Sequence, residues 1–262
     1  MATSGDPTNL NPDWRIRMML YGMPGATKTR TAATATFDER SAPVLILNAS
    51  ANPISIRDYL PFPNIIDVWE LKDLNDPYDW IIRGQPKDDP LVAQFDLTPP
   101  YRTLIVDQIT ELQRMYFDKV MAINSLKPAD IPMKRTYNHF GRVLQGMMHL
   151  SRLYLDQSIP MHIIFVAQER EANTDEGRLV GPMLEGASQV EVPSYCNIVS
   201  RVQHYSQADK TIQRVLEKNH PEASSIAFFA PTGKFQAKDQ FGRLPSYMID
   251  PTFTKMLDLI YG

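Results

Sequence analysis

Cysteine is almost absent from this 262-residue sequence. The lone Cys196 excludes a framework of disulfide bonds and a cysteine-rich zinc site. The five histidines are dispersed without the spacing of metal ligands, which also speaks against zinc. The sequence has no apolar run of about 18 residues and no signal-peptide pattern. We therefore expect a cytoplasmic protein with no membrane partner.

The sequence also lacks a marked excess of charge of either sign. Its net charge of -3 excludes a globally basic nucleic-acid binder, although a local basic patch is still compatible with it. Hydrophobic residues make up 43% of the chain, which is enough for a substantial core. We expect a flexible polar arm over residues 1–13 and a single domain over residues 14–262.

Short apolar runs alternate with amphipathic segments over the first two thirds of the chain. This alternation predicts an α/β fold with a mostly parallel sheet flanked by helices. A later group of strands without helices predicts an antiparallel C-terminal extension of the same sheet. The expected strands are 15–21, 43–48, 65–71, 103–107, 161–167, 197–205, 210–217, 225–230 and 234–238; the expected helices are 28–38, 109–123, 137–156 and 252–261, with a loop over 169–189.

A glycine-rich segment between the first strand and the first helix matches the phosphate-binding P-loop pattern. That pattern is a glycine, four residues and then Gly-Lys-Ser/Thr, and Gly22, Lys28 and Thr29 occupy its positions. Backbone N–H groups of such a loop point at phosphates, the lysine reaches the β- and γ-phosphates, and the hydroxyl is a ligand of Mg²⁺. The expected nucleotide-binding residues are Gly22, Met23, Pro24, Gly25, Ala26, Thr27, Lys28, Thr29 and Arg30.

One position of the loop departs from the pattern, because Thr27 stands where a glycine should precede the lysine. A side chain at this position is expected to weaken phosphate binding or to shift the loop. The alternative interpretation of the segment is an ordinary glycine turn that joins a strand to a helix and binds nothing.

Two later strands end in polar residues suited to a nucleotide site. Asp107 closes the apolar run 103–107 and is the expected second holder of Mg²⁺, together with Thr29. Gln168 closes the next core strand, where a polar side chain can sense the γ-phosphate. The alternatives are a helix-capping aspartate and a solvated strand end.

The ordered set of motifs resembles a known family. Tyr21-Gly-x-Pro-Gly-x-x-Lys-Thr29, Leu104-Ile-Val-Asp107-Gln-Ile-Thr-Glu-Leu112, Tyr137-Asn-His-Phe-Gly141, Val166-Ala-Gln168 and Phe235-Gln-Ala-Lys-Asp-Gln240 carry the resemblance. They are similar to phage-encoded RecA-like P-loop ATPases, also described as AAA-type phage nucleotide-binding proteins and related to phage single-strand annealing recombinases. The resemblance spans about residues 14–248. It implies a RecA-like core, ATP and Mg²⁺ as cofactors, and location in the host cytoplasm.

The resemblance further implies binding of single-stranded DNA and assembly into a homo-oligomeric ring or filament. The two loops expected to face DNA are 124–136 and 169–189. Their candidate cations are Lys127, Lys134, Arg135, Arg170 and Arg178. Single-strand binding needs a cationic track with aromatic platforms, and the second loop has no aromatic residue and five carboxylates. Solvated surface charge is the alternative interpretation of both loops.

Catalytic residues are only partly present in the motif set. The expected catalytic residues are Lys28, Asp107, Gln168 and Lys238, and the resemblance implies that Lys238, or else Arg243, reaches a neighbour's γ-phosphate. A surface lysine is the alternative interpretation of Lys238.

The glutamate that RecA-like enzymes carry just past the second core strand is missing. Asn48 and Ser50 stand there, and neither can accept a proton from water as a general base does, whereas Glu70 lies further along the chain.

Three functions therefore remain open. The first is an ATPase that depends on single-stranded DNA and acts in recombination or replication. The second is a nucleotide-gated switch with little hydrolysis, and the third is a small-molecule kinase, which the lack of an arginine-rich lid disfavours.

Overall fold

A single mixed sheet organises the residues that the computed structural model describes, which are 15–50, 64–69, 101–123, 125, 161–174, 177–186, 188–208, 210–220 and 222–262. Its strands are β1 (Arg17–Gly22), β2 (Val44–Asn48), β3 (Asn64–Asp67), β4 (Thr103–Asp107), β5 (His162–Thr174), β6 (Gly177–Pro182), β7 (Ile198–His204), β8 (Ser225–Phe228), β9 (Lys238–Asp239) and β10 (Tyr247–Ile249). The helices are α1 (Lys28–Ala33), α3 (Ile109–Ile123), α5 (Ser188–Tyr195), α6 (Lys210–Asn219) and α7 (Phe253–Tyr261), with 3₁₀ turns η1 (Thr34–Phe37) and η5 (Tyr205–Gln207).

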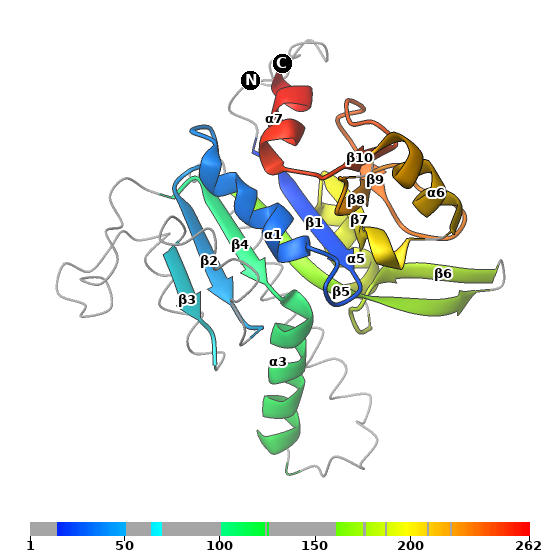
Figure 1. Ribbon diagram of the computed structural model, residues 1–262. Helices are drawn as coiled ribbons and strands as arrows, with labels where there is room; N and C mark the ends of the chain where they lie inside the picture. The colour runs from blue at the N-terminus through cyan, green and yellow to red at the C-terminus, as the bar shows by residue number, and fades with distance from the viewer. Residues whose placement is uncertain are drawn as a thin grey trace, which may run out of the picture.

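The strand order is β10-β8-β7-β1-β5-β4-β2-β3, with β6 paired to β5 and β9 paired to β7 (Figure 1). The strands from β7 to β3 in this order are parallel to one another. The pairs β7–β8, β8–β10, β7–β9 and β5–β6 are antiparallel. The predicted α/β class, a mostly parallel sheet with an antiparallel C-terminal extension, is confirmed.

Side chains alternate between the two faces of the sheet, as the period of a strand requires. Met18 and Leu20 of β1 pack with the α1 and α7 face, whereas Met19 and Tyr21 pack with the opposite face, where α5 lies. Helix α1 lies across one face of the central strands (Figure 1). Helix α7 contacts α1 and the turn η1 that follows it. The central strands are thus covered on both faces, which explains their continuous apolar runs.

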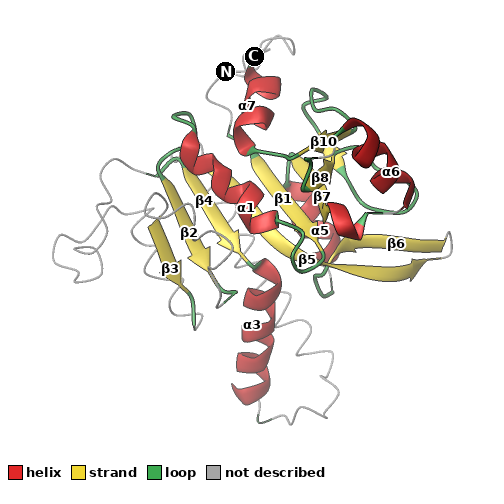
Figure 2. Cartoon of the chain, viewed as in Figure 1, coloured by secondary structure: helices red, strands yellow, loops and turns green. Residues whose placement is uncertain are grey.

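Two expectations about the C-terminal third are wrong. Residues 169–182 are not a loop, because β5 runs on to Thr174 and pairs with β6 in a hairpin (Figure 2). The predicted strand 210–217 is helix α6. Its β-branched residues suggested a strand, but its apolar positions 212, 215 and 216 have helical spacing and its Gln, Arg, Leu, Glu and Lys residues favour a helix. Helix α5 was not expected at all.

Several expectations lie outside the described residues: the arm 1–13, the helix 137–156 and most of the loop 124–136. No helix in the described part of the chain is long and apolar enough to cross a membrane.

Candidate nucleotide-binding site

The predicted P-loop joins β1 to α1 at the carboxyl end of the central strands. Lys28 is almost fully buried, and its Nζ donates hydrogen bonds to the carbonyls of Gly22 at 2.9 Å and Met23 at 2.8 Å. Burial lowers the pKa of Lys28 to about 8, against the opposing effect of the nearby carboxylates. An ammonium group held only by carbonyls in a buried place is well suited to exchange them for a phosphate.

The odd residue of the loop, Thr27, adopts the backbone conformation of the glycine that it replaces. Its φ is 64° and its ψ is 12°, in the left-handed region that a β-branched residue rarely enters. Its hydroxyl is buried without a hydrogen-bond partner among the described residues. Thr27 therefore holds a conformation suited to glycine, at a cost in strain of about 1–2 kcal/mol.

Asp107 and Thr29 meet beside Lys28, as the motif predicts. The Thr29 hydroxyl donates to Asp107 Oδ2 at 2.8 Å, whereas the buried Asp107 Oδ1 has no partner among the described residues. Burial raises the pKa of Asp107, against the opposing effects of the Thr29 hydrogen bond and the Lys28 charge. Mg²⁺ prefers oxygen ligands and is commonly held by one or two protein groups plus phosphates. Asp107 and Thr29 fit that ion.

Gln168 lies next to the first glycine of the loop. It stands opposite Gly22 in the parallel register of β1 and β5. Its Nε2 donates to Gln108 Oε1 at 3.1 Å, and its backbone N–H donates to Thr110 Oγ1 at 3.0 Å. Gln168 thus connects the strand beside the phosphate loop to the residues that follow Asp107.

A carboxylate that the sequence did not point out lies on the same edge of the sheet. Asn48 stands opposite both Asp107 on β4 and Asp67 on β3 in parallel register. Its Nδ2 donates to Asp67 Oδ1 at 2.7 Å, and its Oδ1 accepts from the Ser50 hydroxyl at 2.7 Å. Equivalent positions on parallel strands face the same way, so this row faces the α1 side with Lys28. Only the strand register reveals the row.

A second carboxylate close to the loop faces the other way. Glu169 forms two hydrogen bonds with Arg201 of β7, at 2.9 and 3.0 Å, and both side chains are largely buried. The pair lies on the face of Tyr21, whose hydroxyl donates to the Gln236 carbonyl. Because Glu169 is held there, it does not share the face on which Asn48, Asp67 and Asp107 lie.

The end of β7 and the turn that follows it lie against the P-loop. A Cβ at Gly22 would lie 2.1 Å from the Val202 carbonyl oxygen, so β7 passes too close for any other residue. Beyond it, Gln207 Nε2 donates to the Pro24 carbonyl at 2.9 Å. Of the other predicted binding residues, Met23, Pro24, Gly25 and Arg30 are exposed and Ala26 is buried.

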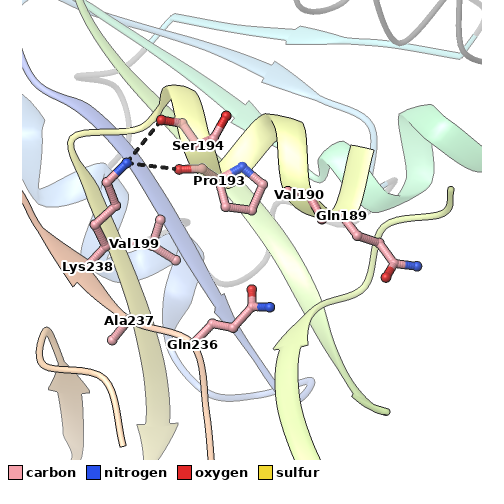
Figure 3. Close-up of a pocket in the computed structure, with 8 residues that line it drawn as sticks. All are labelled: Gln189, Val190, Pro193, Ser194, Val199, Gln236, Ala237 and Lys238. Carbon is pink, nitrogen blue, oxygen red and sulfur yellow. Dashed lines mark hydrogen bonds between the residues drawn. The ribbon is translucent and has the colours of Figure 1, made fainter. Parts of the chain in front are cut away.

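Lys238 lies away from the P-loop of its own chain. It pairs with Val199 near the start of β7, whereas Gly22 approaches Val202 further along that strand. Its Nζ donates to the Ser194 carbonyl at 3.0 Å and to that of Pro193 at 3.5 Å, at the end of α5 (Figure 3). A pocket of about 280 Å³ opens beside it. The role of Lys238 toward a neighbouring subunit stays a prediction. Arg243, the alternative residue for that role, donates a hydrogen bond to the Ile260 carbonyl.

The two predicted DNA-binding cations of the hairpin are each paired with a carboxylate. Arg170 lies 3.3 Å from Glu185, and Arg178 lies 3.3 Å from Glu171. The other candidates, Lys127, Lys134 and Arg135, lie outside the described residues, as does Glu70.

A P-loop strand and an acidic strand separated by one parallel strand, with Asp107 and Gln168 beside the loop, define a P-loop fold of the α/β class. A family model described as an AAA domain matches residues 15–225, and the chain belongs to that family. No curated protein matches the chain. Among solved structures, the crystal structure of the RadB recombinase aligns with a TM-score of 0.41 and 14% identity, covering 83% of this chain and 84% of that one.

Proposed function

We propose that the chain binds ATP with Mg²⁺ and hydrolyses it in a reaction that depends on single-stranded DNA, in phage-type recombination or replication. The observation that supports this most directly is the contact of Thr29 with Asp107 beside the buried Lys28, with one Asp107 oxygen that has no partner among the described residues. This is a set of groups that a metal–nucleotide complex would satisfy. Membership in the AAA-domain family supports the same proposal.

In this proposal, each side chain acts where charge develops. Lys28 leaves the carbonyls of Gly22 and Met23 and binds the β- and γ-phosphates. Thr29 and Asp107 hold Mg²⁺, which supplies charge neutralisation at the phosphates when it is bound. Gln168 orients groups near the γ-phosphate.

The proton acceptor is assigned to Asp67. General-base work needs a carboxylate within reach of the attacking water. Asp67 is exposed at the edge of the sheet and oriented by Asn48, on the face that carries Lys28. Asn48 and Ser50, at the end of β2, are expected to position the water rather than take its proton.

A nucleotide-gated switch with little turnover is the second candidate. The amide of Asn48 at the end of β2 favours it, since no carboxylate stands in the expected place on that strand. In the switch, ATP binding alone would move the β5–β6 hairpin that follows Gln168.

The test is steady-state ATP turnover with and without single-stranded DNA, alongside direct measurement of ATP binding. Turnover that DNA stimulates supports the ATPase. Tight binding without turnover under either condition supports the switch, and absence of ATP binding refutes both.

A further inference from the structure

Helix α6 presents a row of basic side chains to solvent. Lys210, Arg214 and Lys218 are all exposed and are spaced four residues apart. Residues at this spacing share a helix face and lie about 6 Å apart along its axis. The apolar positions of the helix lie on a different side. The basic row is therefore a straight cationic track about 12 Å long.

In the described part of the chain, none of the three cations of this row forms a salt bridge. The one acidic residue of the helix, Glu217, instead accepts a hydrogen bond from the Tyr205 hydroxyl. On a chain with a net charge of -3, such a row is a local exception. Local fields of this kind attract polyanions whatever the total charge.

An aromatic ring accompanies the row. The hydrogen bond to Glu217 holds Tyr205 alongside α6, and the ring is only partly buried. Cationic tracks with adjacent aromatic rings are the common design for single-stranded nucleic acid, because the backbone follows the cations and unpaired bases stack on the rings. Double-stranded nucleic acid offers no free base faces to such a ring.

The row follows, in sequence, a turn that contacts the P-loop. The turn η5 precedes α6, and its Gln207 holds the Pro24 carbonyl of the P-loop. A ligand on α6 would therefore sit on the helix that follows the turn bonded to the phosphate loop.

We propose that the basic face of α6, formed by Lys210, Arg214 and Lys218 with the ring of Tyr205, binds the backbone of single-stranded nucleic acid. The proposal rests on the DNA dependence proposed above and names its surface. It assigns the contact to α6 rather than to the hairpin cations Arg170 and Arg178.

The experiment measures binding of the full chain to a labelled oligothymidylate of about 16 nucleotides, a length sufficient for one site. The triple variant Lys210→Gln, Arg214→Gln and Lys218→Gln keeps residues that favour a helix. Its plot of log affinity against log salt is expected to be shallower by about 2, at about 0.7 per lost phosphate contact. Tyr205→Ala is expected to weaken binding and keep the salt slope.

A matched triple variant supplies the control. Arg114, Lys119 and Lys234 are exposed cations elsewhere, and their replacement by Gln removes the same charge. If this control lowers the salt slope as much as the α6 variant, the effect is one of total charge and the proposal fails. Thermal unfolding of each variant checks that it is folded, and the single variant Arg214→Gln is expected to lower the slope by about 0.7.

Other outcomes separate the two proposals. Wild-type protein that does not bind the oligonucleotide refutes the proposed DNA dependence itself. Wild-type protein that binds with a slope unchanged by the α6 variant overturns only the assignment to α6. Equal affinity for a duplex, or equally α6-dependent binding to anionic lipid vesicles, also overturns it, because it removes the role of unpaired bases.

Discussion

The carboxyl edge of the parallel sheet has two parts that differ in how their polar groups are held. Beside the central strands, Lys28 is buried and bonded to two loop carbonyls, and the buried Asp107 has one oxygen without a partner among the described residues. On the outer strands β2 and β3, Asp67 is exposed and is oriented by Asn48. Buried charges bind a ligand strongly because water does not compete with the ligand for them. An exposed carboxylate, in contrast, exchanges protons with solvent. The central part is thus suited to binding and the outer part to turnover.

Loss of the central cation should have the largest effect. Lys28→Ala removes two or more charge-assisted hydrogen bonds to phosphates and should weaken ATP binding by about 4 kcal/mol, about a thousandfold. Titration calorimetry measures the change. The exposed Lys234→Ala serves as the control and should bind ATP as the wild type does. Unchanged affinity in Lys28→Ala would mean that the loop does not hold phosphates.

Loss of the outer carboxylate, Asp67, should lower the rate of ATP turnover without changing ATP binding. Asp67→Asn keeps the size of the side chain and its acceptor for Asn48 but removes the base, so kcat should fall about a hundredfold or more while the ATP dissociation constant stays unchanged. Single-turnover kinetics and equilibrium binding give the two numbers. Asp118→Asn, on an exposed face of α3, is the matched control. An unchanged kcat, or an equal loss of binding, would remove the distinction between the two parts.

The pH dependence of binding should follow the central lysine. Burial lowers the pKa of Lys28 to about 8, so the ammonium is largely present at pH 7 and largely lost at pH 9 in the free protein. ATP binding requires the charged form, and affinity should fall about tenfold between those values. Lys28→Ala, measured over the same range, should show no such fall. A flat profile for the wild type would contradict the buried, shifted state of this lysine.

Relief of the strained loop residue should have the smallest effect. Thr27→Gly removes a left-handed β-branched residue, and the gain exceeds the added freedom of the unfolded chain, so stability should rise by about 1 kcal/mol. Urea unfolding measures it. The same change at Thr252, which caps α7 in an extended conformation, should lower stability instead. A loss of stability in Thr27→Gly would show that the threonine side chain is required by its surroundings.

The sequence was informative where a motif is local. The strand 103–107 and the helix 109–123 are found with the predicted bounds, and Lys28, Thr29 and Asp107 come together as their pattern indicates. Each of these motifs is a short segment that carries both its conformation and its chemistry, and the meeting of Thr29 with Asp107 across 78 residues is predicted because P-loop proteins pair the two motifs.

Residues brought together by register or by long-range contacts were not predictable in this way. Asp67 is 40 residues from Asp107 in sequence, by the difference of their numbers, and only the order β4-β2-β3 aligns them. The contact of Gln207 with Pro24 spans 183 residues. Helix α6 was mistaken for a strand because its threonine, isoleucine and valine favour strands, although the spacing of its apolar residues is helical.

Because β7 approaches the first glycine of the P-loop closely, the glycine and the lysine of the motif indicate different things about a protein that carries them. Any side chain at Gly22 would collide with the Val202 carbonyl, whether or not a nucleotide is ever bound. A relative that had lost its ligand would still have to retain that glycine in order to fold. No comparable steric constraint applies to Lys28. In comparing relatives of this chain, the glycine is therefore a marker of architecture, and the lysine is the marker of function.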